Sequence, residues 1–190
     1  MRVEGLINDV YRVFVGEGDY IFFSADIISM FDNISMSMVL DVINKELCCR
    51  IAGGYIHLPS LLEIINLDVK LFNYFKFIVP SSSRKQEVRY YCQNQGIPMG
   101  GNTSSIYADL YVSYCISRVR NRLKELGVSL LRKYVDDLLF YAPMRNVQKI
   151  VDLLKESTKL DFTYELPVNG VISYLDVTLS VHEGALSTQW

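Results

Sequence analysis

The feature that most constrains the fold of this chain is Tyr134-Val135-Asp136-Asp137, where two adjacent carboxylates stand between apolar segments. The flanking segments, Leu130–Lys133 and Leu138–Tyr141, are rich in residues that suit half-buried strands. Two such strands joined by an Asp-Asp tip predict a β-hairpin that holds carboxylates at its turn. Adjacent negative charges repel each other, and a divalent cation is the usual reason to place them together. A tight turn that simply suits aspartate is the alternative interpretation.

The composition limits the class of protein. The 190 residues are 50% hydrophobic and 12% aromatic, which is typical of a globular domain and not of a disordered one. The longest apolar stretch, Leu58–Val79, is interrupted by charged residues, so we expect no membrane span. The first residues lack the apolar segment of a signal peptide, and the four cysteines lack metal-ligand spacing. We therefore expect reduced thiols and an intracellular protein, nuclear or cytoplasmic and not secreted.

The net charge of −2 places a condition on nucleic-acid binding. Affinity for nucleic acid comes largely from Lys and Arg on phosphates, and here 19 basic residues face 21 acidic ones. Either the chain binds no nucleic acid, or the basic parts of its binding surface lie outside this stretch.

The hydrophobic pattern predicts a mixed α+β domain, an antiparallel sheet with helices on one face. Besides the hairpin, strands are expected at residues 20–26, 87–93, 162–165 and 172–181, and after Gly184. Helices are expected at residues 35–50, 59–77, 102–127 and 145–160, the first capped by Ser35 or Ser37 and broken at Gly53-Gly54.

Two further segments complete a constellation with the hairpin. Asp26 ends the first predicted strand, and Gln95–Gly101 form a glycine-rich loop that leads into a helix. Carboxylates from two separate strand ends can hold two hard cations between them. Two such metal ions can activate a 3′-hydroxyl as the attacking group and stabilise the leaving pyrophosphate. This chemistry is nucleotidyl transfer, for which the protein supplies mainly positioning and charge.

These pieces, in this order, resemble the palm of reverse transcriptases, and the resemblance covers nearly the whole chain. It is closest to the enzymes of Penelope-like retroelements, whose patterns are similar to five runs of this sequence: Met30–Ile34, Tyr91–Gly100, Ala108–Leu110, Tyr174–Thr178 and Gly184–Thr188. The resemblance implies a ferredoxin-like (RRM-like) polymerase palm with part of the fingers. It also implies that residues 1–190 are a single fragment of a reverse transcriptase domain, with the upstream fingers and the downstream thumb absent.

The resemblance assigns roles to individual residues of the palm. Asp26, Asp136 and Asp137 would be the catalytic carboxylates and the ligands of two Mg²⁺ ions, which Mn²⁺ can replace. Ile27 would lend only its backbone to one ion. Phe31 falls where the family keeps an aromatic wall against the nucleotide sugar, and a ring there excludes a 2′-hydroxyl by steric clash. A plain core aromatic is the alternative for Phe31.

Further residues would contact the nucleotide and the nucleic acid. The nucleotide-binding set implied by the resemblance is Phe31, Gln95, Gly96, Met99 and Gly100, because glycine lets the backbone approach a base pair closely. A simple helix-entry turn is the alternative for Gly100-Gly101. The nucleic-acid contacts would come from Arg132, Lys133 and Tyr134. A solvated helix face is the favoured interpretation of Arg118, Arg120, Arg122 and Lys124.

The chain also departs from the family's pattern. Gly101–Ser105 lacks the two prolines that many relatives have after Met-Gly, and Glu165 stands nearest to the position of a lysine that could protonate pyrophosphate. We therefore assign no general acid.

Three functions follow from these observations. The first is an RNA-directed DNA polymerase of a retroelement, with an RNA template, a DNA primer and dNTPs as partners. The second is a non-catalytic reverse-transcriptase-like domain that serves as a nucleic-acid-binding or scaffold module. The third is a cellular relative, such as a telomerase-type or intron-encoded polymerase. The Tyr174-Leu175-Asp176 segment favours the retroelement branch.

Overall fold

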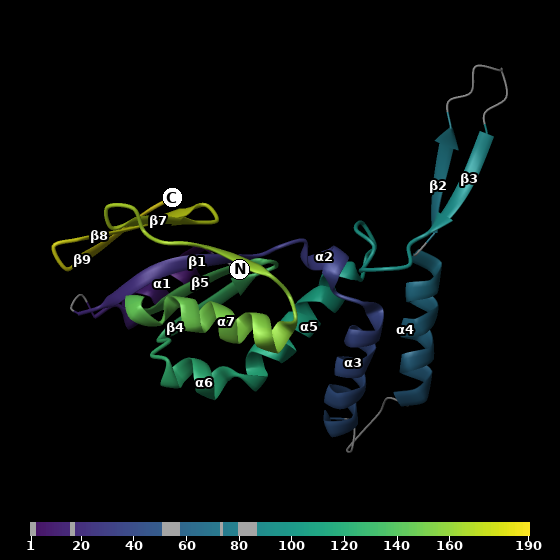
Figure 1. Ribbon diagram of the computed structural model, residues 1–190, viewed down its shortest axis with the longest axis horizontal. Helices are drawn as coiled ribbons and strands as arrows, with labels where there is room; N and C mark the ends of the chain where they lie inside the picture. The colour runs from purple at the N-terminus through teal and green to yellow at the C-terminus, as the bar shows by residue number, and fades with distance from the viewer. Residues whose placement is uncertain (1–2, 16–17, 51–57, 73, 80–86) are drawn as a thin grey trace. The chain divides into compact units, whose positions relative to one another are not determined.

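A four-stranded sheet with the strand order β4-β5-β1-β6 is the framework of the first of two units in the chain, which comprises residues 1–30 and 112–190 (Figure 1). Its strands are β1 (Tyr20–Ile27), β4 (Leu130–Tyr134), β5 (Asp137–Pro143) and β6 (Phe162–Glu165), all paired antiparallel. The computed structural model describes residues 3–15, 18–50, 58–72, 74–79 and 87–190. The predicted α+β class with an antiparallel sheet is confirmed.

Aromatic rings on β1 and β5 fix the register of the two central strands. Phe22 packs against its cross-strand partner Tyr141 with ring centroids 4.5 Å apart, and Phe23 stacks on its partner Phe140 at 4.7 Å. All four side chains are buried. Because successive strand residues point to opposite faces, one pair anchors each face of the sheet. Such a pair contributes about 0.5–1.5 kcal/mol beyond its buried area, so a slipped register would lose both.

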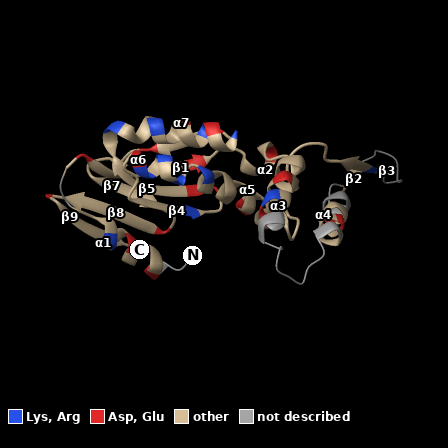
Figure 2. Ribbon diagram, turned by 90° about the horizontal axis from the view of Figure 1, so that it is seen from below, with Lys and Arg blue, Asp and Glu red and all other residues tan. Residues whose placement is uncertain are grey.

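One face of the sheet is covered by helix α1 (Val3–Val13) and by a small antiparallel sheet of β7 (Val171–Tyr174), β8 (Val177–His182) and β9 (Ala185–Gln189). Leu6 and Val10 lie one helical turn apart and join Phe22 and Tyr174 in one buried cluster. Figure 2 shows α6 (Arg120–Glu125) and α7 (Val147–Thr158) on the other side of the sheet from α1. The first unit therefore has helices on both faces of its sheet, whereas the sequence predicted helices on one face. The helix that was not predicted is α1.

Several predicted elements of the first unit are confirmed, and two are wrong. β1, β6, β9, α7 and the β4–β5 hairpin form where the sequence predicts them. The strand predicted at 172–181 is a hairpin, because Leu175 adopts φ 53° and turns the chain between β7 and β8. The helix predicted at 102–127 is two helices, α5 (Ser104–Arg118) and α6. The break lies at Val119, whose N–H bonds to the carbonyl of Ile116 in a tightened last turn.

The second unit comprises residues 31–111. It contains α3 (Met36–Arg50), α4 (Leu58–Phe72), the two-stranded sheet of β2 (Tyr74–Val79) and β3 (Glu87–Cys92), and the start of α5. The short helix α2 (Met30–Asn33) begins at the boundary. Of the two predicted caps, Ser35 and Ser37, it is Ser35 that caps α3, since its Oγ accepts a hydrogen bond from the Met38 N–H at 3.3 Å.

The helix predicted at 59–77 ends earlier than expected. Its last predicted residues belong to β2, because the aromatic and β-branched run Tyr74–Val79 pairs along its whole length with β3. The predicted break at Gly53-Gly54 and the predicted loop after Pro80 lie outside the described residues. Among the described helices, none is long and apolar enough to span a bilayer.

Candidate active site

The register of β1 and β5 places two of the three predicted carboxylates opposite each other. Asp26, the penultimate residue of β1, is the direct cross-strand partner of Asp137, the first residue of β5. Direct partners project from the same face of a sheet. Asp136 precedes Asp137, and its carbonyl oxygen accepts a hydrogen bond from the Ile27 N–H at 3.2 Å. The structure thus brings Asp26, Asp136 and Asp137 to one end of the sheet.

The hairpin tip that presents Asp136 has a strained backbone. Val135 and Asp136 form a two-residue turn that is closed by the pair Tyr134 and Asp137. Val135 adopts φ 55°, a left-handed conformation that is costly for a β-branched residue. The Lys133 Nζ donates a hydrogen bond to the Val135 carbonyl at 3.0 Å, and strand pairing holds the residues on both sides. The surrounding contacts therefore impose the geometry of this turn.

Mutual repulsion and partial burial make two of these carboxylates harder to ionise. The pKa of Asp26 is raised above its ordinary value of 3.8, first by desolvation and then by the charge of Asp136, while the Ile27 N–H opposes the change. The pKa of Asp137 is raised by desolvation and by the charges of Asp136 and Asp26. Negative charge is therefore concentrated at this edge of the sheet.

A small cavity of about 140 Å³ opens beside the two paired carboxylates. Residues of β1, β6 and the β7–β8 hairpin complete its lining: Ser24, Ala25, Asp26, Asp137, Thr163, Tyr164, Glu165, Ser173, Tyr174 and Leu175. Glu165, which stands nearest to the position of the family's lysine, adds another carboxylate to this lining. The cavity gives the carboxylates access to a small ligand.

Tyr174 belongs to this site, although the sequence indicated it only as part of the run Tyr174–Thr178 and assigned it no role. Its side chain is 3% exposed, and its hydroxyl donates a hydrogen bond to the Asp137 carbonyl at 3.3 Å. Burial and the charge of Asp137 raise the pKa of Tyr174 to about 12, against the opposing charge of Arg132. Tyr174 therefore stays protonated at neutral pH and ties β7 to the start of β5. The sequence signal was its place at the head of Tyr174–Thr178.

The donor set of this edge suits a hard cation. Carboxylate oxygens are the ligands that Mg²⁺ prefers, and three carboxylates close enough to perturb one another gain from a shared counter-ion. Among the residues that the structure describes, no three His, Cys, Asp or Glu side chains are gathered as tightly as a formed metal site. The Ile27 N–H donates a hydrogen bond to the Asp136 carbonyl. The predicted contact of the Ile27 backbone with a metal ion therefore concerns its carbonyl oxygen.

Two parts of the predicted nucleotide site meet within the second unit. The Ile97 N–H donates a hydrogen bond to the Phe31 carbonyl at 2.6 Å. Gly96 has φ +82°, and a Cβ there would lie 2.8 Å from the Phe31 carbonyl oxygen and 2.9 Å from the Asp32 Cα. Only glycine permits this approach of the loop to α2. The structure therefore joins Phe31 and Gly96, and the role of Phe31 against a nucleotide sugar stays a prediction.

The other predicted nucleotide residues lie on the same loop. Gln95, Met99 and Gly100 are exposed, and Met99 is 64% exposed. Gly100 has φ +90° with open space around it, so it serves the turn without a close contact. The Ser104 Oγ donates a hydrogen bond to the Pro98 carbonyl at 2.5 Å and fixes the entry to α5. The loop thus presents Met99 to solvent from a rigid base.

The three predicted nucleic-acid contacts stand at the end of β4. Arg132 pairs with Asp9 of α1, its Nε lying 2.8 Å from the Asp9 Oδ2. Lys133 bonds to the hairpin tip, and Tyr134 is 45% exposed. Contact of these residues with nucleic acid stays a prediction.

Comparison with known proteins agrees with this architecture. No family model matches the sequence, and no curated protein matches it. A truncated apo telomerase from Candida tropicalis superimposes with a TM-score of 0.67 at 13% identity over 99% of this chain. Another structure of apo telomerase from Candida tropicalis gives a TM-score of 0.70 at 11% identity over 97% of the chain. The chain has a reverse-transcriptase-like fold.

A third structure has the same reverse-transcriptase-like fold. Candida albicans telomerase, solved in complex with a fragment of telomeric RNA, gives a TM-score of 0.66 at 13% identity over 97% of this chain. The chain spans only 39%, 36% and 35% of the length of these three telomerase chains, in the order given. The palm-like fold predicted from the sequence is confirmed.

The contact between Gly96 and α2 yields a test of the nucleotide loop. Gly96→Ala should lower the free energy of unfolding by about 2–3 kcal/mol, because it adds both left-handed strain and a clash with backbone. Gly100→Ala is the matched control in the same loop, and should cost only about 1–2 kcal/mol because strain acts there alone. Urea titrations measure both, and equal costs would contradict the close packing of Gly96 on Phe31.

The raised pKa values predict how stability changes with pH when metal is absent. A carboxyl whose pKa is higher in the folded state than in the unfolded state destabilises the fold as pH rises through that window, starting near about 3.9. In EDTA, Asp137→Asn should therefore be more stable than the parent at neutral pH, and its advantage should vanish in acid. Asp176→Asn, on the exposed turn after Leu175, is the control. An advantage of Asp137→Asn that is constant with pH would refute the charge repulsion.

Proposed function

We propose that this chain provides the palm of an RNA-directed DNA polymerase. The observation that carries the proposal is the register that sets Asp26 opposite Asp137 with Asp136 beside them at a hairpin tip. In the reaction, the 3′-oxygen of a primer attacks the α-phosphorus of a dNTP. A phosphodiester bond forms, pyrophosphate leaves, and the hydroxyl proton passes to solvent.

Asp26, Asp136 and Asp137 would hold two Mg²⁺ ions, or Mn²⁺ in their place, with the Ile27 carbonyl beside them. The ions would lower the pKa of the primer hydroxyl and neutralise charge on the leaving pyrophosphate. The protein's own part is to hold the carboxylates on two paired strands, so that a shift in one strand is resisted by the aromatic pairs behind them. The ordered β4–β5 turn positions Asp136.

Phe31 and the Gly96 loop would receive the incoming nucleotide. Their backbone contacts support this assignment, because they hold the Phe31 main chain against the glycine loop. The Phe31 ring would stand against the 2′ position of the sugar and exclude ribonucleotides by steric clash. Gln95, Met99 and Gly100 would line the approach of the base pair, with Arg132, Lys133 and Tyr134 on the nucleic acid.

The template would be RNA, the primer DNA, and the setting intracellular. The Candida albicans telomerase structure contains an RNA fragment, which supports RNA as a ligand for a domain of this fold. Within the family, the five sequence runs similar to Penelope-like enzymes favour a retroelement polymerase. The alternative, a non-catalytic nucleic-acid-binding module, predicts binding of the template-primer without turnover.

Substitution of the paired carboxylates tests the activity. Asp26→Asn and Asp136→Asn should each lower primer extension on an RNA template by about a hundredfold or more, because the charge that holds and orients the ions is lost. Primer extension with radiolabelled dNTP measures this in the complete polypeptide that carries the sequence, and Asp176→Asn is the control. A parent protein that binds template-primer but never extends it would establish the non-catalytic alternative.

The position of Phe31 predicts sugar selection. Phe31→Val should raise ribonucleotide incorporation relative to deoxyribonucleotide incorporation by roughly ten- to a hundredfold, because a clash with the 2′-hydroxyl is removed. The ratio of the two kcat/KM values measures the effect. Phe77→Val, at an aromatic residue of β2 that is 56% exposed, should leave the ratio unchanged. If Phe31→Val is folded and active with an unchanged ratio, Phe31 is a packing residue.

A further inference from the structure

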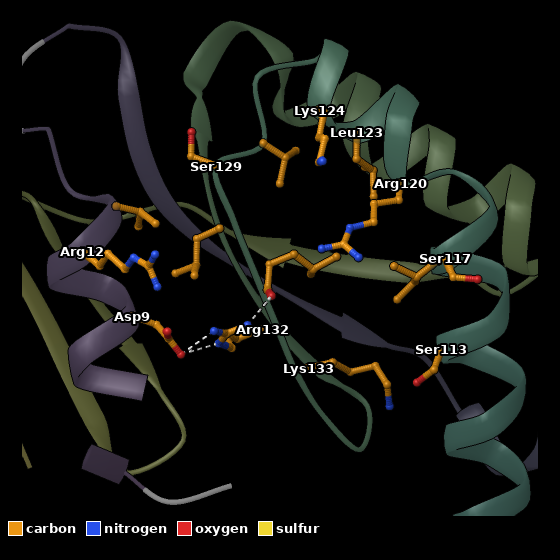
Figure 3. A pocket seen from close by; sticks show the side chains of 15 residues that line it. Asp9, Arg12, Ser113, Ser117, Arg120, Leu123, Lys124, Ser129, Arg132 and Lys133 are labelled. Carbon is orange, nitrogen blue, oxygen red and sulfur yellow. Dashed lines mark hydrogen bonds and ion pairs between the residues drawn. The ribbon is translucent and has the colours of Figure 1, made fainter. Parts of the chain in front are cut away.

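A second and larger cavity lies within the first unit, away from the carboxylate edge. Its volume is about 480 Å³, within the size range of small-molecule sites. It is enclosed by α1, the second half of α5, α6 and the edge strand β4 (Figure 3). It shares no lining residue with the cavity beside Asp26 and Asp137. Of its lining residues, Arg132 and Lys133 are also proposed nucleic-acid contacts, whereas Arg12, Arg120 and Lys124 have no part in the proposed polymerase reaction.

The polar lining of this cavity is strongly cationic. A single acid, Asp9, stands among five basic residues, which are Arg12, Arg120, Lys124, Arg132 and Lys133. The chain as a whole carries a net charge of −2, so this concentration of positive charge runs against its overall balance. Asp9 is already paired with Arg132. Most of the positive charge is therefore not neutralised by the acid within the cavity.

The cations come from separate elements and converge. Figure 3 shows Arg12 of α1 and Arg120 of α6 pointing toward one another across the cavity, with Arg132 of β4 between them. Within the described part of the chain, Arg12 and Arg120 form no ion pair, although both are exposed enough to meet a solvent anion. The Ser113 side chain stands on the α5 wall, whereas the Ser117 hydroxyl donates a hydrogen bond to the Tyr114 carbonyl of the same helix. Guanidinium forks and a serine hydroxyl together match the oxygens of a phosphate.

The α6 helix separates its cations into two groups. The sequence alone favoured a solvated face for all of them. Arg122 fits that expectation, since it is exposed and lies 3.7 Å from Glu156 of α7. Arg120 and Lys124 instead line the cavity. Arg122 therefore offers a matched control of the same charge on the same helix.

We propose that this cavity binds the phosphate group of a nucleotide. The remaining walls are apolar, with Ile116, Leu123 and Leu130 among them, which suits the sugar and base that accompany such a phosphate. The nucleotide is either free in solution or part of a nucleic-acid strand, because the two share this chemistry. The proposal rests on Arg12 and Arg120, which the proposed polymerase function does not use, so each proposal can fail without the other.

Binding of inorganic pyrophosphate and of a 5′-phosphorylated oligothymidylate tests the proposal. Both are titrated into the whole chain in EDTA, which removes metal-dependent binding at the aspartates. Calorimetry reports the pyrophosphate, and fluorescence anisotropy reports the labelled oligonucleotide. Arg12→Gln and Arg120→Gln should each weaken binding by about tenfold, the loss of one charge-assisted contact. Arg122→Gln should change it less than about twofold.

The two probes also distinguish the source of the phosphate. If pyrophosphate binds tightly and the oligonucleotide does not displace it, the ligand is a free nucleotide. If the oligonucleotide displaces pyrophosphate, the ligand is a nucleic-acid strand. Arg120→Lys, which keeps the charge but loses the guanidinium fork, should weaken binding less than Arg120→Gln and serves if Arg120→Gln fails to fold. The proposal is overturned if neither probe binds saturably, or if Arg122→Gln weakens binding as much as Arg12→Gln and Arg120→Gln do.

Discussion

The antiparallel pairing of β1 with β5 is the interaction on which the candidate site depends. It sets Asp26 opposite Asp137 and, through the Ile27 N–H, fastens the hairpin tip at Asp136 to the end of β1. A slip of one residue would turn every side chain of β1 to the other face. The aromatic pairs of Phe22 with Tyr141 and Phe23 with Phe140 oppose that slip from both faces. Core packing and site geometry are thus one property of these two strands.

Interactions that disfavour folding are concentrated at the carboxylate end of the sheet. The left-handed Val135 and the repulsion among the aspartates both act against folding, and both lie at or beside the hairpin tip. They are offset by the buried strands and by Tyr174, whose hydroxyl holds the first residue of β5 from the side. Strain and charge repulsion placed together in this way are typical of sites that bind a counter-ion.

The distribution of charge within the first unit differs from what its sum suggests. Acidic groups gather at the end of β1 and β5, whereas basic groups from α1, α6 and β4 gather around the larger cavity. The sequence total of −2 hides both groups because they nearly cancel. The net charge left two options, no binding of nucleic acid or a basic surface outside this stretch; the structure shows five basic side chains gathered within the stretch itself.

Most strands, the Asp-Asp hairpin and a serine cap at the start of α3 could be predicted from the sequence alone, because β-propensity, turn chemistry and capping act between residues that are near in the chain. Motif order also singled out the three aspartates and the glycine loop as candidate site residues. That Leu175 turns the chain into a hairpin and that Tyr74–Val79 forms a strand emerged from the fold alone, since a positive φ and a distant pairing partner leave no local signal.

The placement of Tyr174 and of the cavity arginines was likewise set by tertiary packing. Arg12 and Arg120 are separated by more than a hundred positions in the sequence, and Tyr174 reaches Asp137 across 37. No periodicity or spacing connects residues so far apart. Their contacts follow from the packing of α1, α6 and β7 around one sheet, because burial of apolar faces brings the polar groups at their edges together.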